Sequence, residues 1–332
     1  MLIDIEHLQP ATVKAIEWQL VFMNEPDMNE FRSEHLVFAG NGMSAVACVE
    51  ELLKRGQVFD ITIFGDEPHP NYDRTLLTGI LAGERDADSI ILNDIEWYQE
   101  HGIRTRLGIR VEEIDRPNRA VRSSDGDWTS YDKLILATGS RPEIPSIGGL
   151  DKDGVFVFGT LDDARKLAEA AGPGVRAVVI GGWLAAEAAR SLRKRGCEVV
   201  IVEPGSDDMQ LDTVVGNGRV EAVRFTSGEE FGAELVVIAT NLRPNTMLAL
   251  PAGLQVNRGI VVNDQMETSD PHIFAVGGCT EHKGHTFESF PPLLEQAKVL
   301  AGNLAGARRT GFMDLDAVFQ ELTASPLHHR AE

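Results

Sequence analysis

Apolar runs alternate with glycine turns and helical periodicity along much of this chain. The run Leu36–Ala39 leads into Gly40-Asn41-Gly42, and helical spacing then continues to Lys54-Arg55, where Gly56 ends it. A second apolar run, Asp60–Phe64, stops at Gly65. Strand, glycine turn, helix and strand in this order predict a βαβ unit, whose crossover requires parallel strands buried on both faces.

The same pattern recurs later in the chain, where Gly181 follows Gly40 by 141 positions. The run Ala177–Ile180 leads into Gly181-Gly182-Trp183, a helix ends at Gly196, and Val199–Val202 forms the next apolar run. Two such units predict two dinucleotide-binding folds in one chain. We therefore predict an α/β protein with two Rossmann-like domains, the second inserted in the first and truncated.

The remaining pattern supplies the other elements and the domain limits. A helical arm is expected over Thr12–Met23, a hairpin over Val121–Trp128 and a long helix over Pro292–Leu304. Further strands are expected at Leu134–Ala137, Arg219–Phe225, Glu234–Ile238 and Ile273–Val276. The predicted limits are 1–35 for the N-terminal arm, 36–150 and 256–310 for the two parts of the first dinucleotide domain, 151–255 for the reduced second domain, and 311–332 for a tail.

The composition of the chain argues against several classes of function. The 332 residues carry 31 Lys and Arg against 51 Asp and Glu, a net charge of −20, which disfavours nucleic acid and anionic lipid as partners. No apolar run reaches the roughly 18 residues that span a bilayer, and the N-terminus shows no signal-peptide core. Three widely spaced cysteines are typical of a reducing compartment. We therefore expect a cytoplasmic protein.

The first glycine loop is the sharper phosphate-binding signal. Gly40 permits a tight turn, Gly42 lets the backbone approach a pyrophosphate, and the amides of Met43 and Ser44 open the helix. Ala45 is small enough for close helix packing. The second strand is followed by Asp66-Glu67, acids suited to bind ribose hydroxyls. The alternative is a purely structural turn.

The second glycine loop departs from this pattern. In register with the first, the position that needs no side chain is Trp183, whose indole would stand in the pyrophosphate site. Gly40 to Gly56 spans 16 positions, whereas Gly181 to Gly196 spans 15, so one residue is missing. Either Gly181, Gly182 and Glu203 bind a nicotinamide cofactor, or the domain is a scaffold without a ligand.

Other chemistry-bearing residues are sparse. Cys279, His282 and His285 could supply three metal ligands, but no fourth is evident and the intervening residues suggest a solvated loop. No Cys-x-x-Cys pair, nucleophile elbow or Walker loop occurs. We expect no metal and no covalent catalysis by a side chain.

These motifs resemble the pyridine nucleotide-disulfide oxidoreductase class, and most of all the FAD/NAD module of bacterial NAD(P)H nitrite reductase large subunits. The resemblance covers about residues 36–306. It rests on the segments Leu36–Met43, Ile61–Pro68, Asn71–Thr78, Tyr131–Pro142, Thr268–Gly277 and Glu295–Ala301.

The resemblance implies a site for FAD in the first domain. Gly40, Gly42 and Asp66 would hold the adenosine diphosphate half, and Val111 would touch the adenine. The helix beginning near Pro292 would place its amino end under the flavin pyrimidine, where its dipole favours the reduced form. Further residues assigned to the cofactor by the resemblance are Met43, Ser44, Ala45, Glu67, Arg74, Thr138, Gly139, Arg141, Gly277, Gly278 and Gln296.

Three departures from the family pattern bear on this assignment. The family has an acid after the glycine of Ala275-Val276-Gly277, and here that position is Gly278. The second glycine loop is shortened, and the short stretch from Glu203 to Gly216 leaves out about a helix and a strand of the second domain. The iron-sulfur and sirohaem domains of full nitrite reductases are also absent from this sequence.

The resemblance implies an FAD-dependent oxidoreductase that passes electrons from a reduced nicotinamide cofactor through flavin to a separate redox partner, in nitrite or nitrate assimilation. The alternative is an FAD-holding or degenerate subunit of a larger reductase that does not itself use NAD(P)H. In both cases we expect a protein partner, and self-association remains open.

Overall fold

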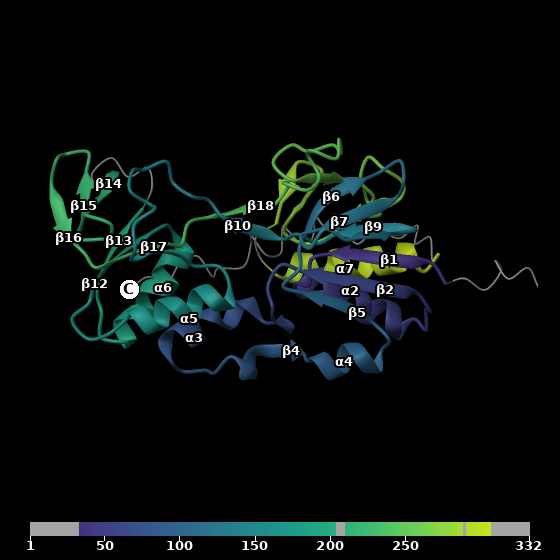
Figure 1. Cartoon of the computed structure of the whole chain (residues 1–332), viewed down its shortest axis with the longest axis horizontal. Coiled ribbons are helices and arrows are strands. Elements are labelled where there is room, and N and C mark those ends of the chain that lie inside the picture. Colours follow the sequence, from purple (N-terminus) through teal and green to yellow (C-terminus); the bar gives the residue numbers. More distant parts are fainter. Residues whose placement is uncertain (1–32, 204–209, 288–289, 307–332) are drawn as a thin grey trace, which may run out of the picture. The chain divides into compact units, whose positions relative to one another are not determined.

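The computed structural model describes residues 33–203, 210–287 and 290–306, and its compact unit begins at His35. The arm expected at 12–23 and the tail expected at 311–332 lie outside the described residues. Figure 1 shows the elements as labelled below.

The first domain is built on a five-stranded parallel sheet of order β20-β9-β1-β2-β5. Apolar residues fill its central strands, so that the three residues Leu36, Val37 and Phe38 are fully buried, as parallel strands covered on both faces require. The strands are β1 (His35–Ala39), β2 (Asp60–Gly65), β5 (Arg104–Leu107), β9 (Lys133–Leu136) and β20 (Ile273–Ala275).

Two long helices cover this sheet and pack against one another. Helix α2 (Met43–Lys54) follows the first glycine loop, and helix α7 (Phe290–Leu304) follows β20. The apolar face of α2, which includes Val46, Val49 and Leu52, lies in the main core. Because β20 and α7 come after the second domain in sequence, the expected insertion of the second domain into the first is confirmed.

The second domain has a four-stranded parallel sheet of order β11-β17-β12-β13. Strand β13 is its edge, and no described residue adds a strand beyond it, as the truncation predicts. The elements are β11 (Val155–Val157), α5 (Leu161–Ala170), β12 (Arg176–Ile180), α6 (Trp183–Lys194), β13 (Glu198–Val202) and β17 (Leu235–Ile238).

The internal repeat extends beyond the two βαβ units. Each domain carries an antiparallel three-stranded meander, and an antiparallel ribbon of two short strands joins the domains. The meanders are β6 (Val111–Asp115), β7 (Ala120–Ser123) and β8 (Trp128–Ser130), and β14 (Leu211–Val215), β15 (Ala222–Phe225) and β16 (Glu230–Gly232). The ribbon consists of β10 (Ser140–Pro142) and β18 (Leu242–Pro244).

One segment of the first domain packs on the second. Helix α3 (Leu77–Ala82) contacts both α5 and α6, and its residues Leu77, Ile80 and Leu81 are buried in one cluster with the second domain. The remaining elements are β3 (Asn71–Tyr72), η1 (Arg74–Leu76), η2 (Asp88–Ile90), β4 (Ile91–Asn93), α4 (Ile95–Glu100), β19 (Ile260–Val262), β21 (Thr280–His282) and β22 (His285–Thr286).

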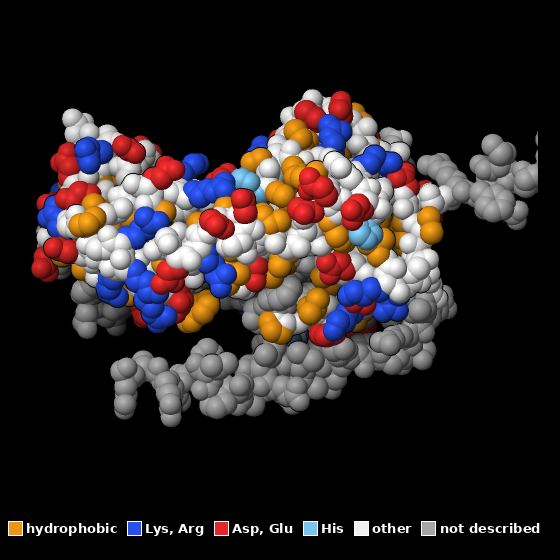
Figure 2. All heavy atoms as spheres, turned by 90° about the horizontal axis from the view of Figure 1, so that it is seen from below, with side chains coloured by type: hydrophobic (Ala, Val, Ile, Leu, Met, Phe, Trp, Pro, Cys, Tyr) orange, Lys and Arg blue, Asp and Glu red, His pale blue; other side chains and the backbone are white. Residues whose placement is uncertain are grey.

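On the face drawn in Figure 2, acidic and basic side chains are interspersed, with apolar atoms scattered between them. Among the residues that the structure describes, none of the helices has the length and apolar character needed to cross a lipid bilayer.

Candidate functional site

The first glycine loop lies at the carboxyl end of the first sheet, between β1 and α2. Gly40 has a φ of +126°, and a side chain there would place its Cβ 2.1 Å from the carbonyl oxygen of Ala137. Only glycine fits this combination of backbone angle and close approach. The loop is therefore fixed against the end of β9.

Gly42 serves a different purpose. It is the N-cap of α2 with an ordinary φ of −80°, and a Cβ at this position would meet nothing within 4 Å. No side chain in the described part of the chain caps the helix, and its first turn holds no acid. Met43 is half-buried, while Ser44 and Ala45 are buried. The open space at Gly42 and the uncapped amides form a site that suits an anion.

Asn41, between these glycines, was missed by the sequence reasoning. Its Oδ1 accepts a hydrogen bond of 2.9 Å from the buried Tyr98 hydroxyl, while its Nδ2 is buried without a partner in the described residues. Burial raises the pKa of Tyr98 to about 12, so this hydroxyl stays a donor. Its position between the two glycines of the first loop is the feature of the sequence that could have identified it.

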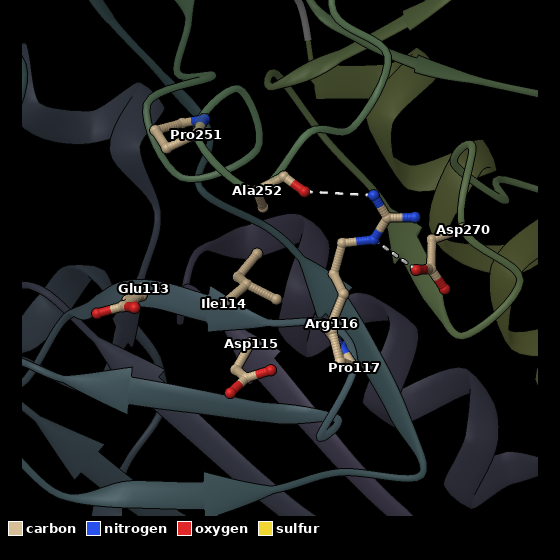
Figure 3. Close-up of a pocket in the computed structure, with 8 residues that line it drawn as sticks. All are labelled: Glu113, Ile114, Asp115, Arg116, Pro117, Pro251, Ala252 and Asp270. Atoms are coloured by element: carbon tan, nitrogen blue, oxygen red, sulfur yellow. Dashed lines mark hydrogen bonds and ion pairs between the residues drawn. The ribbon is translucent and has the colours of Figure 1, made fainter.

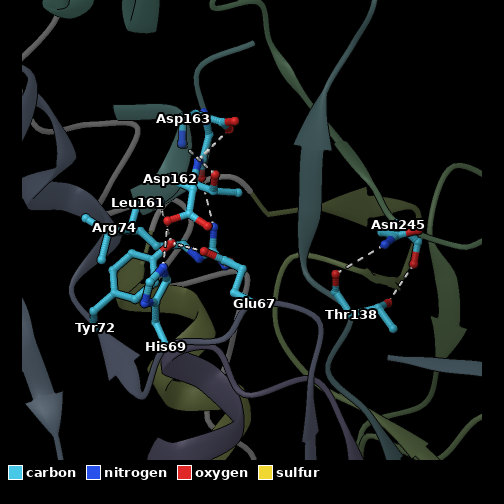
Figure 4. A network of polar contacts seen from close by, with 11 residues as sticks. Glu67, His69, Tyr72, Arg74, Thr138, Leu161, Asp162, Asp163 and Asn245 are labelled. Carbon is cyan, nitrogen blue, oxygen red and sulfur yellow. Dashed lines mark hydrogen bonds and ion pairs between the residues drawn. The ribbon is translucent and has the colours of Figure 1, made fainter. Parts of the chain in front are cut away.

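The two acids after β2 differ in their environment. Asp66 is exposed. Glu67 instead accepts a hydrogen bond of 2.7 Å from the Tyr72 hydroxyl and pairs with Arg74, which also donates to Gly159 O at 2.8 Å (Figure 4). Glu67 and Arg74 therefore take part in contacts with the second domain. Asp66 is exposed and accessible to a ligand.

The segment after β9 is held by Asn245. The Thr138 hydroxyl donates to Asn245 O at 2.7 Å (Figure 4), and the Asn245 N–H donates to Gly139 O at 2.9 Å. Gly139 has a φ of +65° and open space at its Cβ position. Arg141 is exposed on the ribbon, where its guanidinium contacts Met247 Sδ.

The loop after β20 closes on the same region. A Cβ at Gly277, whose φ is +90°, would lie 2.8 Å from Ser44 Oγ. The Gln296 side-chain oxygen accepts from the Gly277 N–H at 2.8 Å. At Gly278, a Cβ would lie 3.0 Å from Ser140 Oγ, so a larger side chain would press on Ser140. Residues far apart in sequence are thus gathered around the first turn of α2.

Helix α7 and β6 complete the region. Helix α7 starts at Phe290 with no acid in its first turn, and Pro292 is buried there. Proline suits this position because first-turn amides have no partner within the helix. Val111 begins β6 and is half-buried against the same core. The preceding turn is tied to the residues after β2, since the Gly108 N–H donates to Glu67 O at 3.0 Å.

These features fit a flavin dinucleotide. The open position at Gly42, the uncapped α2 and the unsatisfied Asn41 Nδ2 offer donors for phosphates, and the exposed Asp66 can accept from ribose hydroxyls. Gly278 supplies no side-chain acceptor. The residues would therefore bind FAD mainly through the dinucleotide half and the loop backbone.

The second glycine loop repeats part of this geometry. Gly181 has a φ of +144°, and its Cβ would lie 2.1 Å from Ala239 O, as at Gly40. The N-cap of α6 is Gly182, and Trp183 is the first helical residue with 76% of its surface exposed. The expected alignment of Trp183 with Gly42 was wrong. The N-caps Gly42 and Gly182 correspond to each other, so the residue missing from the second loop is the one equivalent to Asn41. Glu203, after β13, is exposed.

The candidate metal ligands have structural partners. Cys279 is fully buried, and His282 Nε2 lies 2.7 Å from Asp264 Oδ1. The described residues contain no group of three side chains placed to hold a metal ion. Burial raises the pKa of both the Cys279 and the Cys48 thiols, so neither is a thiolate at neutral pH.

A separate cavity of about 590 Å³ lies between β6 and the segment before β19. Arg116 crosses it, donating to Asp270 at 2.7 Å and to Ala252 O at 3.3 Å (Figure 3). Burial raises the pKa of Asp270, but bonds from the His272 N–H and Arg116 outweigh this and leave it lowered. Arg116 and Asp270 thus find their hydrogen-bond partners within the protein, which indicates a structural role for these contacts.

Comparison with known proteins agrees with this arrangement. The pyridine nucleotide-disulphide oxidoreductase family matches residues 34–213 and 208–299. The "assimilatory nitrate reductase electron transfer subunit" of Bacillus subtilis (strain 168) is 41% identical over 304 residues, which are 83% of this chain and 39% of that protein. The chain thus spans well under half of that relative.

Smaller reductases match over more of their length. The "probable ferredoxin reductase CtmF" of Castellaniella defragrans is 33% identical over 314 residues, covering 83% of this chain and 77% of that protein. The crystal structure of a covalent putidaredoxin reductase–putidaredoxin complex matches with a TM-score of 0.76 and 28% identity, covering 83% and 76% of the two chains. The chain belongs to the pyridine nucleotide-disulphide oxidoreductase family.

Proposed function

We propose that this protein is an FAD-dependent oxidoreductase that takes electrons from a reduced nicotinamide cofactor and delivers them to a separate redox partner. The observation that carries the proposal is the open, uncapped start of α2 at Gly42, beside a Gly40 that only glycine can occupy. Family membership and the similarity to reductases that serve nitrate reduction and ferredoxin support the same function.

The chain's own contribution is binding and orientation. The α2 amides and Asn41 would bind the phosphates, Asp66 the ribose, and the start of α7 would place positive dipole charge near the ring. When bound, the flavin supplies the redox chemistry, since it accepts hydride and can release electrons singly. The buried thiols Cys48 and Cys279 are held as neutral groups and offer no thiol relay.

The second domain would receive the nicotinamide cofactor at Gly181 and Gly182. Glu203, exposed after β13, would accept from the ribose and repel a 2′-phosphate, which favours NADH over NADPH. Nitrate or nitrite assimilation is the setting that the similarity to the Bacillus subtilis subunit supports.

A second candidate is a flavin-holding subunit that does not react with a nicotinamide cofactor. The observations that favour it are the shortened second loop, the exposed Trp183 at the start of α6, and the absence of a described strand beyond β13. In folds of this type the dinucleotide binds in a crevice at the carboxyl ends of neighbouring strands. No described strand lies beyond β13, so one side of such a crevice is missing in the described part of the second domain.

One experiment separates the two candidates. The purified protein is saturated with FAD, and its visible spectrum is followed without oxygen after addition of NADH, NADPH or dithionite. Bleaching by NADH at catalytic speed supports the reductase, and faster bleaching by NADH than NADPH supports the role of Glu203. Bleaching by dithionite alone supports the non-reacting subunit. A protein that takes up no FAD contradicts both.

A further inference from the structure

Tyr98 lies in a buried chain of hydrogen bonds that ends at the first glycine loop. Its hydroxyl accepts from the backbone N–H of Asn71 at 3.4 Å and donates to Asn41 Oδ1 at 2.9 Å. The Asn71 Nδ2 donates to Asn93 Oδ1 at 2.9 Å, and Asn93 Nδ2 donates to the Glu50 carboxylate at 3.0 Å. Helix α2 and the loop that precedes it are thus joined through β3, β4 and α4.

The Tyr98 hydroxyl determines which way the Asn41 amide points. A backbone N–H can only donate, so the bond from Asn71 uses an oxygen lone pair of the hydroxyl and leaves its proton for Asn41. Burial raises the pKa of Tyr98 to about 12, so this proton stays in place at neutral pH. The Asn41 amide therefore turns its oxygen to Tyr98, and reversing the amide would take this acceptor away from the proton.

The nitrogen of the same amide lacks a partner. Asn41 Nδ2 is buried and has no hydrogen-bond partner among the described residues. An unpaired buried donor destabilises a protein, and an acceptor brought by a ligand removes that cost. Asn41 directly precedes Gly42, the N-cap of α2, where no described side chain pairs with the first amides of the helix. A side-chain donor beside several backbone N–H groups suits a ligand with several oxygen acceptors, such as a diphosphate.

Packing also fixes the position of Asn41. A Cβ at Gly65, the last residue of β2, would lie 3.2 Å from Asn41 Cβ, so a larger residue there would press on the Asn41 side chain. The second glycine loop is one residue shorter and has no equivalent of Asn41. The arrangement of tyrosine and amide therefore belongs to the first loop and to the ligand bound there.

We propose that Tyr98 is a positioning residue for the cofactor diphosphate, because its hydroxyl holds the Asn41 amide with the N–H groups directed away from the tyrosine, to be paired by a phosphate oxygen. Tyr98 acts through Asn41 and does not itself contact the cofactor. This inference rests on the proposed flavin-binding function. It adds a residue of α4, 57 positions from Asn41 in sequence, that determines how tightly the diphosphate is held.

The test compares dissociation constants for FAD and for ADP, which carries the diphosphate without the flavin, by calorimetry on the full chain. Tyr98→Phe removes the hydroxyl and keeps the ring, and we expect it to weaken the binding of both ligands about fivefold. Asn41→Ala should weaken both about tenfold. The double variant should bind like Asn41→Ala alone, within about twofold, because Tyr98 acts through Asn41.

Asn41→Asp separates the two ends of the side chain. The carboxylate still accepts from Tyr98, but it offers an oxygen in place of the N–H and repels phosphate, so both ligands should bind about 50-fold more weakly. Tyr131→Phe is the matched control, because Tyr131 is buried and its hydroxyl has no hydrogen-bond partner among the described residues. It should change both constants less than about twofold.

Thermal unfolding of each variant reports separately on the fold. Additive losses in the double variant, parent-like binding by Tyr98→Phe, or parent-like binding by Asn41→Asp would each overturn the positioning role while leaving flavin binding intact. A parent protein that binds ADP but not FAD contradicts the proposed function, and the ADP series then still decides the role of Tyr98. A parent protein that binds neither ligand overturns both.

Discussion

The hydroxyl of Tyr72 accepts a hydrogen bond of 3.0 Å from the backbone N–H of Leu161, the first residue of α5. The same hydroxyl donates to Glu67 at 2.7 Å, and burial raises its pKa, so it remains protonated. A side chain of the first domain thus satisfies a helix-terminal amide of the second. His69, whose Nε2 lies 2.8 Å from Asp162, and Arg74, bonded to Gly159 O, hold the same turn.

Tyr72→Phe tests this contact between the domains. The ring would keep its apolar packing, but Glu67 and the Leu161 N–H would lose their partner. We expect the free energy of unfolding to fall by about 1–2 kcal/mol, measured by urea denaturation. Tyr131→Phe is the control, since Tyr131 is also buried and its hydroxyl has no hydrogen-bond partner among the residues that the structure describes. Equal losses in both variants would contradict a specific role for the Tyr72 hydroxyl.

Gly42→Leu tests the phosphate site. The backbone of Gly42 is accessible to any residue and the space is open, so the fold should be retained while the leucine side chain blocks the cofactor. We expect FAD affinity to fall on the order of 100-fold, which is about 2.7 kcal/mol. The measurement is flavin absorbance after incubation with FAD and gel filtration.

Gly172→Leu is the matched control for this substitution, because its Cβ position is also open and it lies in the second domain. Gly40→Ala should instead prevent folding, since its Cβ would clash with Ala137 O. A yellow Gly42→Leu protein would show that the phosphates bind elsewhere.

Trp183 offers an optical test of the second glycine loop. Its exposed indole lies at the start of α6, so NAD⁺ bound at Gly181 and Gly182 should quench tryptophan emission. The quenching should disappear in Trp183→Phe and persist in Trp128→Phe, which also removes an exposed indole. Saturable quenching that survives in Trp183→Phe would place the nucleotide away from this loop.

Acid sensitivity is expected at Glu281. Burial raises its pKa, but hydrogen bonds from Asn257 and the Gly259 and Arg258 N–H groups outweigh this and leave the pKa lowered. A carboxylate with a lowered folded-state pKa stabilises the protein above its unfolded pKa, and this stability is lost as pH falls through the folded value.

Glu281→Gln should therefore lower the free energy of unfolding by about 2 kcal/mol at pH 7, and by progressively less below about pH 4.5. Urea denaturation at several pH values measures the difference. Glu229→Gln, on an exposed turn, is the control. A pH-independent difference for Glu281→Gln would rule out the charge as its cause.

The sequence predicted the two βαβ units because strand and helix periodicities change at glycines with fixed roles, as at Gly40 and Gly181. It also predicted the insertion and the truncated second sheet, since the repeat and the short stretch after Glu203 are visible without coordinates. The alignment of the second glycine loop with the first was misjudged at Trp183. Residue spacing shows that the second loop is one residue shorter, but only the helix N-cap in the structure shows which residue is missing.

The contacts between the domains were not predictable in the same way. Helix α3 has only six residues, too few for a clear periodic signal, and its packing on α5 and α6 joins distant parts of the chain. Glu67 was assigned to the cofactor from its position after β2, yet Tyr72 and Arg74 engage it through contacts that spacing does not encode. The assignment of the cofactor residues stays a prediction.

The order of the strands in the first sheet has a consequence during protein synthesis. Strand β20 and helix α7 leave the ribosome only after the whole second domain, although they pair with β9 and pack on α2. The nascent chain must keep the edge of β9 uncovered while more than a hundred residues are added. We therefore expect the cofactor to be acquired only after β20 and α7 have been synthesised, and chaperones that shield the unpaired edge of β9 to raise the yield.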